Sequence, residues 1–269
     1  MPDTNDGRPQ LPPEGTIPPL PTVSEFEDSV VVVTGGTDGL GRHLTKTLCS
    51  FGAHVFFCGR SREKADAVLA QCRARGHFMR LDLADPEATR EFVRSVGTFR
   101  GSIDYVVNNA AVDARTPVHE VDVETFDTLV AVNLRAQFLV CQAAVPFLEE
   151  GAGKAIVNIG TTNWMHGWSG MSVYSASKSG LLGMTRTLAR DFGPKGIRVN
   201  MVSPGWIMTE RQLADHIDGS AMRDLVETQC VKSLLDEQFV TPATLFMLSR
   251  ASGGMSGQNL VVDGGKHFQ

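Results

Sequence analysis

Tyr174 and Lys178 are the residues of this sequence best suited to acid–base chemistry, and they end the segment 156–178. If Tyr174 begins a helix, a spacing of four residues places both side chains on one face, one turn apart. A neighbouring ammonium favours the phenolate, so a phenol with a reference pKa of about 10 can exchange protons nearer neutrality. Thr161, at the end of the preceding apolar run, offers a hydroxyl to hold a carbonyl or alcohol oxygen. The pattern indicates a general acid/base, although an exposed Tyr and Lys on an amphipathic helix would show the same spacing.

A glycine-rich turn, TGGTDGLG at residues 34–41, lies between the β-branched apolar run 29–33 and a helical pattern through Leu44 and Leu48. Such a helix start presents free backbone N–H groups and a favourable dipole to a phosphate. The glycine spacing is GxxxGxG, which differs from the GxGxxG of the common dinucleotide fingerprint. Its position between a strand and a helix still predicts a dinucleotide site.

The residues after the second expected strand, 53–58, bear on the choice of cofactor. An acidic residue there would bind a ribose 2′-hydroxyl, as in NAD-binding proteins. Gly59 stands at that place, and Arg60 and Ser61 could hold a 2′-phosphate. The sequence therefore favours NADP(H), with NAD(H) as the alternative. A solvated basic face is the competing interpretation, and Asp38 in the glycine turn argues against a phosphate close by.

Strands and helices alternate along the rest of the chain. Further strands are expected at 78–81, 103–107, 155–159, 197–202 and 259–262, and long helices at about 123–148 and 174–192. This rhythm predicts a single α/β domain, a Rossmann-type doubly wound parallel sheet of about seven strands with helices on both faces. Ligands bind at the carboxyl ends of the strands of such sheets, where every polar cluster described above falls.

The ends of the chain differ from its middle in composition. Residues 1–25 are rich in proline and are expected to form a disordered leader, followed by a catalytic domain at 26–269. The polar, poorly periodic stretch 209–232 is expected to be a mobile lid.

Composition excludes several classes of protein. A net charge of −5 gives no sign of a nucleic-acid surface. No apolar run approaches the roughly 20 residues of a membrane span, and no signal-peptide pattern opens the chain, so we expect a cytoplasmic protein outside the membrane. Five cysteines without metal-ligand spacing predict buried thiols and no metal.

Taken together, these motifs resemble the short-chain dehydrogenase/reductase superfamily over about residues 26–265. The matching pieces are TGGTDGLG at 34–41, LDL at 81–83, NNAA at 108–111, Asn133 in VNLRA, YSASK at 174–178 and PGWIMT at 204–209. The resemblance implies that Tyr174 is the catalytic acid/base, that Lys178 lowers its pKa and binds the nicotinamide ribose, and that Asn133 helps to hold a proton-relaying water chain. Thr161 stands where the family usually has serine. The implied cofactor contacts are Gly35, Thr37, Asp38, Gly39, Leu40, Gly41, Arg60, Ser61, Asp82, Leu83, Asn109, Ala110, Ala111, Tyr174, Lys178, Pro204, Gly205, Ile207 and Thr209.

A narrower likeness is to sugar (aldose) 1-dehydrogenases, through NNAAVDAR, NLRAQF, NIGTTNW and GWIMTERQ. It implies substrate contacts from Asp113, Arg115, Thr162, Asn163, Trp164, Trp206 and Arg211. Each has a plainer interpretation, such as a loop ion pair, core packing or a surface charge. Met171, His166 and Trp168 would line the same cleft and could equally fit a larger, flatter ketone.

The expected function is hydride transfer between a nicotinamide and a secondary alcohol or carbonyl, with an aldose 1-dehydrogenase as its specific form. An NADPH-dependent ketone reductase of secondary metabolism is the alternative within the enzymes. A nucleotide-binding regulator without turnover is the alternative of another class, and the intact Asn133, Tyr174 and Lys178 argue against it. The resemblance also implies a homotetramer or homodimer.

Overall fold

A computed structural model describes residues 22–215 and 219–267, without the side chains of Arg211 and of residues 214–221. Residues 1–21 of the predicted leader lie outside this range. The centre of the fold is a parallel sheet of seven strands in the order β3-β2-β1-β4-β5-β6-β7. The strands are β1 (Val30–Val33), β2 (His54–Gly59), β3 (Gly76–Arg80), β4 (Tyr105–Asn108), β5 (Ala155–Ile159), β6 (Arg198–Pro204) and β7 (Asn259–Val262). The predicted doubly wound sheet is confirmed.

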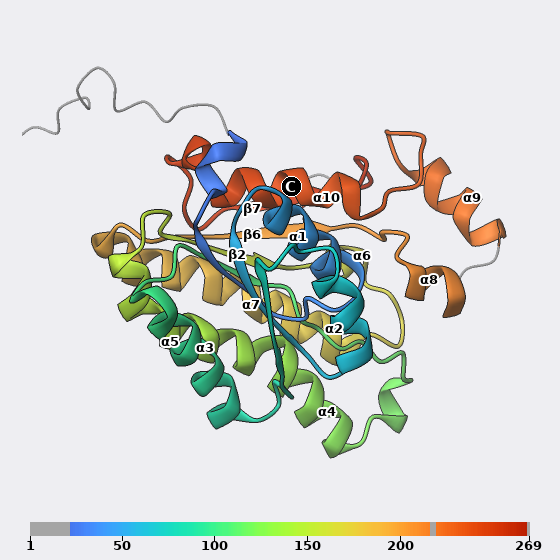
Figure 1. The fold of residues 1–269 in the computed structure, drawn as a ribbon. Coiled ribbons are helices and arrows are strands. Elements are labelled where there is room, and N and C mark those ends of the chain that lie inside the picture. The colour runs from blue at the N-terminus through green and yellow to red at the C-terminus, as the bar shows by residue number, and fades with distance from the viewer. Residues whose placement is uncertain (1–21, 216–218, 268–269) are drawn as a thin grey trace, which may run out of the picture.

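Helices cover both faces of the sheet (Figure 1). The elements are α1 (Gly39–Ser50), α2 (Arg62–Leu69), α3 (Pro86–Arg100), α4 (Val123–Val130), α5 (Ala136–Glu150), α6 (Asn163–His166), α7 (Ser172–Phe192), α8 (Glu210–Asp215), α9 (Gly219–Thr228) and α10 (Glu237–Leu248). Alternate residues of β1 face opposite cores, because side chains alternate along a strand. Val31 and Val33 pack in one core with α1, α2 and α10, whereas Val30 and Val32 pack in the other with α3, α5 and α7.

The helix expected at 123–148 is interrupted between α4 and α5 by a π-helical turn, Ala131–Arg135. Such turns are rare and often mark functional sites, and this one carries Asn133. The combined run Val123–Leu148 is long and apolar enough to cross a membrane by length and composition. However, 61% of its apolar window is buried inside the fold, as expected of a core helix in a globular domain.

The stretch 209–232 is the segment that the sequence predicts to be a lid. It contains α8 and α9, which lie at one end of the molecule beyond the sheet (Figure 1). Arg42 of α1 holds the first residue of α8 through two hydrogen bonds to the Glu210 carboxylate, 2.8 and 3.1 Å long. At the other end of the stretch, Gln229 is buried and donates to the carbonyl oxygens of Val231 and Ser233.

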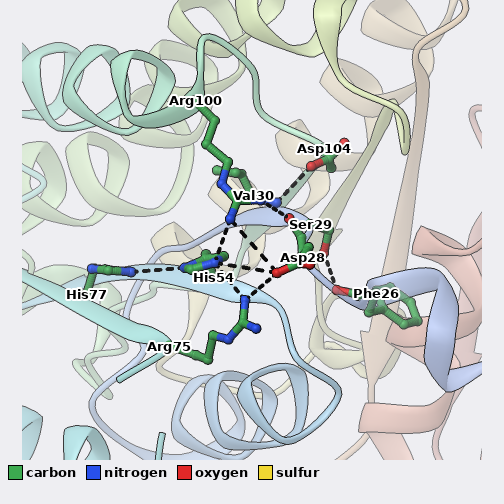
Figure 2. Close-up of polar contacts among 9 residues, drawn as sticks. All are labelled: Phe26, Asp28, Ser29, Val30, His54, Arg75, His77, Arg100 and Asp104. Atoms are coloured by element: carbon green, nitrogen blue, oxygen red, sulfur yellow. Dashed lines mark hydrogen bonds and ion pairs between the residues drawn. The ribbon is translucent and has the colours of Figure 1, made fainter. Parts of the chain in front are cut away.

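A polar network ties together the amino ends of β1, β2 and β3 (Figure 2). Arg75 donates to Asp28 over 2.6 Å, and both Arg75 and Arg100 contact Nε2 of His54, at 2.7 and 3.0 Å. A guanidinium has only donors, so His54 Nε2 accepts and its proton resides on Nδ1, which faces His77 Nε2 at 3.5 Å. This network fixes the amino ends of these strands, on the side of the sheet opposite to the carboxyl ends.

Candidate active site

A cavity of about 680 Å³ lies across the carboxyl ends of the strands. It is lined by the loops that follow the strands, together with α6, the start of α7 and the lid stretch. The structure brings nearly all of the predicted site residues to this one cavity. The exceptions among the described side chains are Gly41, Asn133 and Trp164, and the side chain of Arg211 is outside the described part.

The glycine turn packs against the loop after β4. Gly35 has φ +67°, and a Cβ on it would lie 2.9 Å from the Cα of Ala110. Gly41 lies behind the turn, where a Cβ would come within 2.1 Å of the Gly35 carbonyl oxygen. The Thr34 hydroxyl accepts the backbone N–H groups of Asn109 and Ala110, both at 3.0 Å. A dinucleotide fits this close-packed turn, because only glycines let a backbone approach a pyrophosphate at a helix start.

Basic side chains lie where the adenosine end of a dinucleotide would bind. Arg60 and Ser61 line the cavity after β2, and so does Lys64 of α2, which the sequence analysis did not select. Lys64 forms an ion pair with Asp38. Although partial burial acts in the opposite direction, the Lys64 ammonium and the Gly39 N–H hold the pKa of Asp38 below its usual value. The negative charge of Asp38 is therefore balanced by the Lys64 ammonium.

The three groups predicted to do the chemistry all line the cavity. Tyr174 and Lys178 both lie in the first two turns of α7, which begins at Ser172. Lys178 is 1% exposed, and its ammonium donates to the carbonyl oxygen of Ile159 over 2.7 Å. Burial lowers the pKa of Lys178 to about 8, so its cationic form still predominates at pH 7. Thr161 accepts the backbone N–H of Asn163 at 3.1 Å, which leaves its hydroxyl proton available to donate.

Asn133 is buried behind this group and outside the cavity lining. Its amide forms two hydrogen bonds of 2.8 Å with the backbone N–H and carbonyl of Val112, and a third of 3.3 Å with Ser177. These bonds join the loop after β4 to α7. The side chain of Asn133 thus positions cavity walls, and a role in a water chain stays a prediction.

The other end of the cavity, which we call the substrate end, has an aromatic and basic lining. It consists of Arg115, His166, Trp168, Trp206, Lys266 and His267. The indoles of Trp168 and Trp206 meet edge to face with centroids 5.2 Å apart, and Trp206 donates to Gln212 over 2.8 Å. Burial, with Lys266 and His267 nearby, lowers the pKa of His166. Asp113, Thr162 and Asn163 also line the cavity, and Asn163 accepts a hydrogen bond from Ser175.

One expectation about this end needs revision, and two of its residues were not predicted. Trp164 does not line the cavity, and its indole Nε1 is buried on α6, so we no longer assign it to the substrate. Lys266 and His267 were missed, although their place just after β7 was the available signal: they too follow a strand at its carboxyl end.

A parallel doubly wound sheet with a dinucleotide cavity that holds Tyr174, Lys178 and Thr161 defines a nicotinamide-dependent oxidoreductase. A sequence profile described as "Enoyl-(Acyl carrier protein) reductase" matches residues 35–267. The chain belongs to the short-chain dehydrogenase/reductase superfamily, whose members use NAD(P).

Curated relatives and solved structures agree with this assignment. The "Probable galactose dehydrogenase GalD" of Rhizobium meliloti (strain 1021) is 34% identical over 245 residues, which cover 90% of this chain and 96% of the relative. A D-xylose 1-dehydrogenase of Caulobacter vibrioides (strain NA1000 / CB15N) is 34% identical over 239 residues, with coverage of 87% and 94%. A blue fluorescent protein from a metagenomic library, solved in complex with NADPH, has a TM-score of 0.83 and 32% identity, with coverage of 91% and 100%.

Proposed function

We propose that this oxidoreductase is an NADP(H)-dependent aldose 1-dehydrogenase. The observation that carries the proposal is that Tyr174, Thr161 and Lys178 line the same cavity as the glycine turn and the aromatic substrate end. The relatives named for galactose and D-xylose oxidation support the choice of sugar. The narrow likeness in residues 108–115 and 205–212 points the same way.

In the proposed oxidation, a bound nicotinamide would accept the C–H hydrogen of the anomeric carbon with both electrons, and Tyr174 would accept the hydroxyl proton. The C1–O bond becomes a carbonyl, so the sugar leaves as its lactone. Thr161 and Tyr174 hold the reacting oxygen, and the Lys178 cation favours the phenolate that accepts the proton. When bound, the nicotinamide supplies the hydride acceptor, and the chain supplies position and the proton path.

The preference for NADP(H) rests on Arg60, Ser61 and Lys64. Arg60 is exposed at the cavity, where its guanidinium can bind a 2′-phosphate in a bidentate manner. The Ser61 hydroxyl caps α2 by accepting the Lys64 N–H at 3.2 Å, and it keeps its proton for a phosphate oxygen. The related structure in complex with NADPH is consistent with this choice.

A second candidate is an NADPH-dependent ketone reductase, and one observation favours it. Trp168, Trp206 and the buried Met171 give the substrate end broad apolar faces that suit a flat, larger ketone. A 7alpha-hydroxysteroid dehydrogenase of Bacteroides fragilis is 30% identical over 252 residues. A panel of aldoses and cyclic ketones, assayed in both directions, decides between the two.

The test of the catalytic assignment is Tyr174→Phe. The variant should lose about 10²- to 10⁴-fold in kcat and keep its affinity for NADP(H), since the phenol acts on the substrate. Tyr105→Phe is the matched control, because Tyr105 is the chain's other tyrosine and is buried in β4. Equal turnover in the two variants would refute the role of Tyr174. Cofactor binding by the unmodified protein without turnover of any alcohol, sugar or ketone would favour the regulator.

We also propose that the protein self-associates as a homodimer or homotetramer and that 209–232 acts as a lid. Phe126 of α4 and Phe138 of α5 are 48% and 41% exposed, which suits a helical contact between subunits. Gln212 and the buried Leu225 line the cavity from the lid stretch. Light scattering of the chain and of Phe138→Glu tests the subunit contact. A cytoplasmic location fits the five free cysteines.

A further inference from the structure

The substrate end carries more positive charge than a neutral sugar requires. The Cζ of Arg115 lies 5.8 Å from the ring centroid of Trp168 and 5.6 Å from that of Trp206. The Nζ of Lys266 lies 5.8 Å from the centroid of Trp168. Two cations from distant parts of the chain thus stand at the same indole. Arg115 is exposed and Lys266 is half-buried, and an anion bound at this indole would be attracted by both charges.

Hydrogen bonds hold the turn 263–267, which carries Lys266, in a fixed position beside the cavity. Asp263, at 4% exposure, accepts the backbone N–H groups of Gly265, Lys266 and His267 over 2.9 to 3.1 Å. The same carboxylate contacts Nδ1 of His267 at 2.8 Å. Nε2 of His267 in turn lies 3.3 Å from Nδ1 of His166. Lys266 is therefore presented to the cavity by a fixed turn, which limits the entropy lost when it binds a ligand.

The carboxylates nearby do not cancel this charge. Among the side chains that the structure describes, Asp113 is the one carboxylate that lines the substrate end, against the two cations Arg115 and Lys266. The charge of Asp263 is already used by three N–H groups and an imidazole. Asp38 and Asp82 line the cavity next to the glycine turn and β3, away from this end. Set against the single charge of Asp113, the two cations leave one positive charge for a ligand.

We propose that the substrate is an anionic carbohydrate, whose carboxylate or phosphate binds Arg115 and Lys266 while its reacting carbon faces Tyr174. This inference rests on the proposed sugar oxidation and specifies its substrate class. The apolar face of the sugar ring packs on Trp168 and Trp206. The guanidinium of Arg115 and the ammonium of Lys266 form charge-assisted hydrogen bonds with the anion.

The experiment compares matched sugars with the full chain and NADP⁺. The pairs are galactose with galacturonate and glucose with glucuronate, and glucose 6-phosphate separates a phosphate from a carboxylate. We expect kcat/KM for at least one anionic sugar to exceed that of its neutral partner at least tenfold. Faster turnover of both neutral sugars than of every anionic one would overturn the inference and leave the proposed sugar oxidation intact.

Substitutions of Arg115 and Lys266 test whether these two residues bind the anionic group of the sugar. Arg115→Gln and Lys266→Gln should each raise KM for the anionic sugar about tenfold or more, and by a much larger factor than for its neutral partner. Arg94→Gln, on the exposed face of α3, removes one charge elsewhere and is the matched control. Losses of equal size on both sugars of a pair, or in all three variants, would contradict the assignment.

A binding measurement keeps the inference testable if no sugar turns over. The complex of the enzyme with NADP⁺ is titrated with galacturonate, glucose 6-phosphate and galactose in a calorimeter. Heat from an anionic sugar that is lost in Arg115→Gln supports the anion site even if the sugar oxidation fails. Absence of binding by both anionic sugars rejects it. Thermal melting and NADP⁺ affinity of each variant report whether it is folded.

Discussion

Lys178 donates a hydrogen bond of 2.7 Å to the carbonyl oxygen of Ile159, the last residue of β5. The bond holds the ammonium one helical turn beyond Tyr174 and away from water, and burial lowers the pKa of Lys178 to about 8 from 10.5. Between pH 8 and 10.5 the unfolded chain binds the proton more strongly than the folded chain does. The contribution of Lys178 to stability therefore rises with pH across that window.

We predict that wild type gains stability relative to Lys178→Met as the pH rises from 7.5 to 10, by on the order of 1.4 kcal/mol per pH unit within the window. Urea unfolding at several pH values measures the difference. Lys232→Met is the control, because Lys232 also donates to a backbone carbonyl, that of Glu227, but is exposed. A difference between wild type and Lys178→Met that stays constant with pH would contradict the buried titration.

Asn133 is predicted to position the cavity wall. Asn133→Ala leaves the N–H and carbonyl of Val112 without their 2.8 Å partners, at a cost of about 1–3 kcal/mol for each group that stays buried. The loop that carries Asp113 and Arg115 should then loosen, and KM for the sugar should rise. Chemical denaturation and steady-state kinetics measure the two effects.

Asn200→Ala is the control for Asn133→Ala, because it separates a loss of stability from a loss of positioning at the cavity wall. The buried Asn200 likewise bridges a carbonyl and an N–H, those of Met255 and Gln258, but lies in β6 outside the cavity lining. It should lose stability with little change in KM. If both variants lose stability and neither changes KM, the positioning role of Asn133 is wrong.

The sequence predicts those parts of the fold that local chemistry determines. The run 29–33 is β-branched and buried on both faces, so β1 could be placed within one residue. The helix from Ser172 was placed within two residues through the spacing of Tyr174 and Lys178. Because polar residues after strands converge in a parallel sheet, most of the candidate site followed from the order of the strands.

What the sequence does not reveal depends on contacts between distant segments. The helices α8 and α9 are short and polar, and tertiary bonds such as Arg42–Glu210 accompany them. Asn133 in the π-helical turn forms hydrogen bonds to Val112 and Ser177, and no local sequence pattern predicts these contacts. From the sequence alone, Gly59 was interpreted as a position that lacks the acidic residue of NAD-binding proteins. The structure adds a steric reason, since a Cβ there would lie 2.8 Å from Cγ2 and Oγ1 of Thr37.

Arg60 should determine the choice of cofactor. Arg60→Ala removes the guanidinium that we assign to the 2′-phosphate, so Kd for NADP⁺ should rise tenfold or more while Kd for NAD⁺ changes less than twofold. Fluorescence titration measures both. Arg62→Ala is a close control, because Arg62 begins α2 and pairs with Asp66 at 2.9 Å outside the cavity lining. Equal weakening of the two cofactors in Arg60→Ala would refute the phosphate contact.

His54 should make the fold sensitive to mild acid. Burial and the cations Arg100 and Arg75, with His77 beside them, lower the pKa of His54 from 6.5, although Asp28 acts in the opposite direction. Protonation would put a donor on Nε2, the atom that now accepts from both guanidinium groups (Figure 2). Below pH 6.5 the unfolded chain therefore binds more protons at this position, and stability falls as the pH falls.

The matching experiment uses His54→Gln, because the glutamine carbonyl oxygen can accept from the same arginines and does not titrate. Between pH 6.5 and 5 the variant should lose less stability than wild type, by at most about 1.4 kcal/mol per pH unit for one group. His119→Gln, at a histidine whose side chain is 78% exposed, should follow wild type. Urea unfolding at these pH values measures the slopes. Parallel slopes for wild type and His54→Gln would mean that the network in Figure 2 does not control acid unfolding.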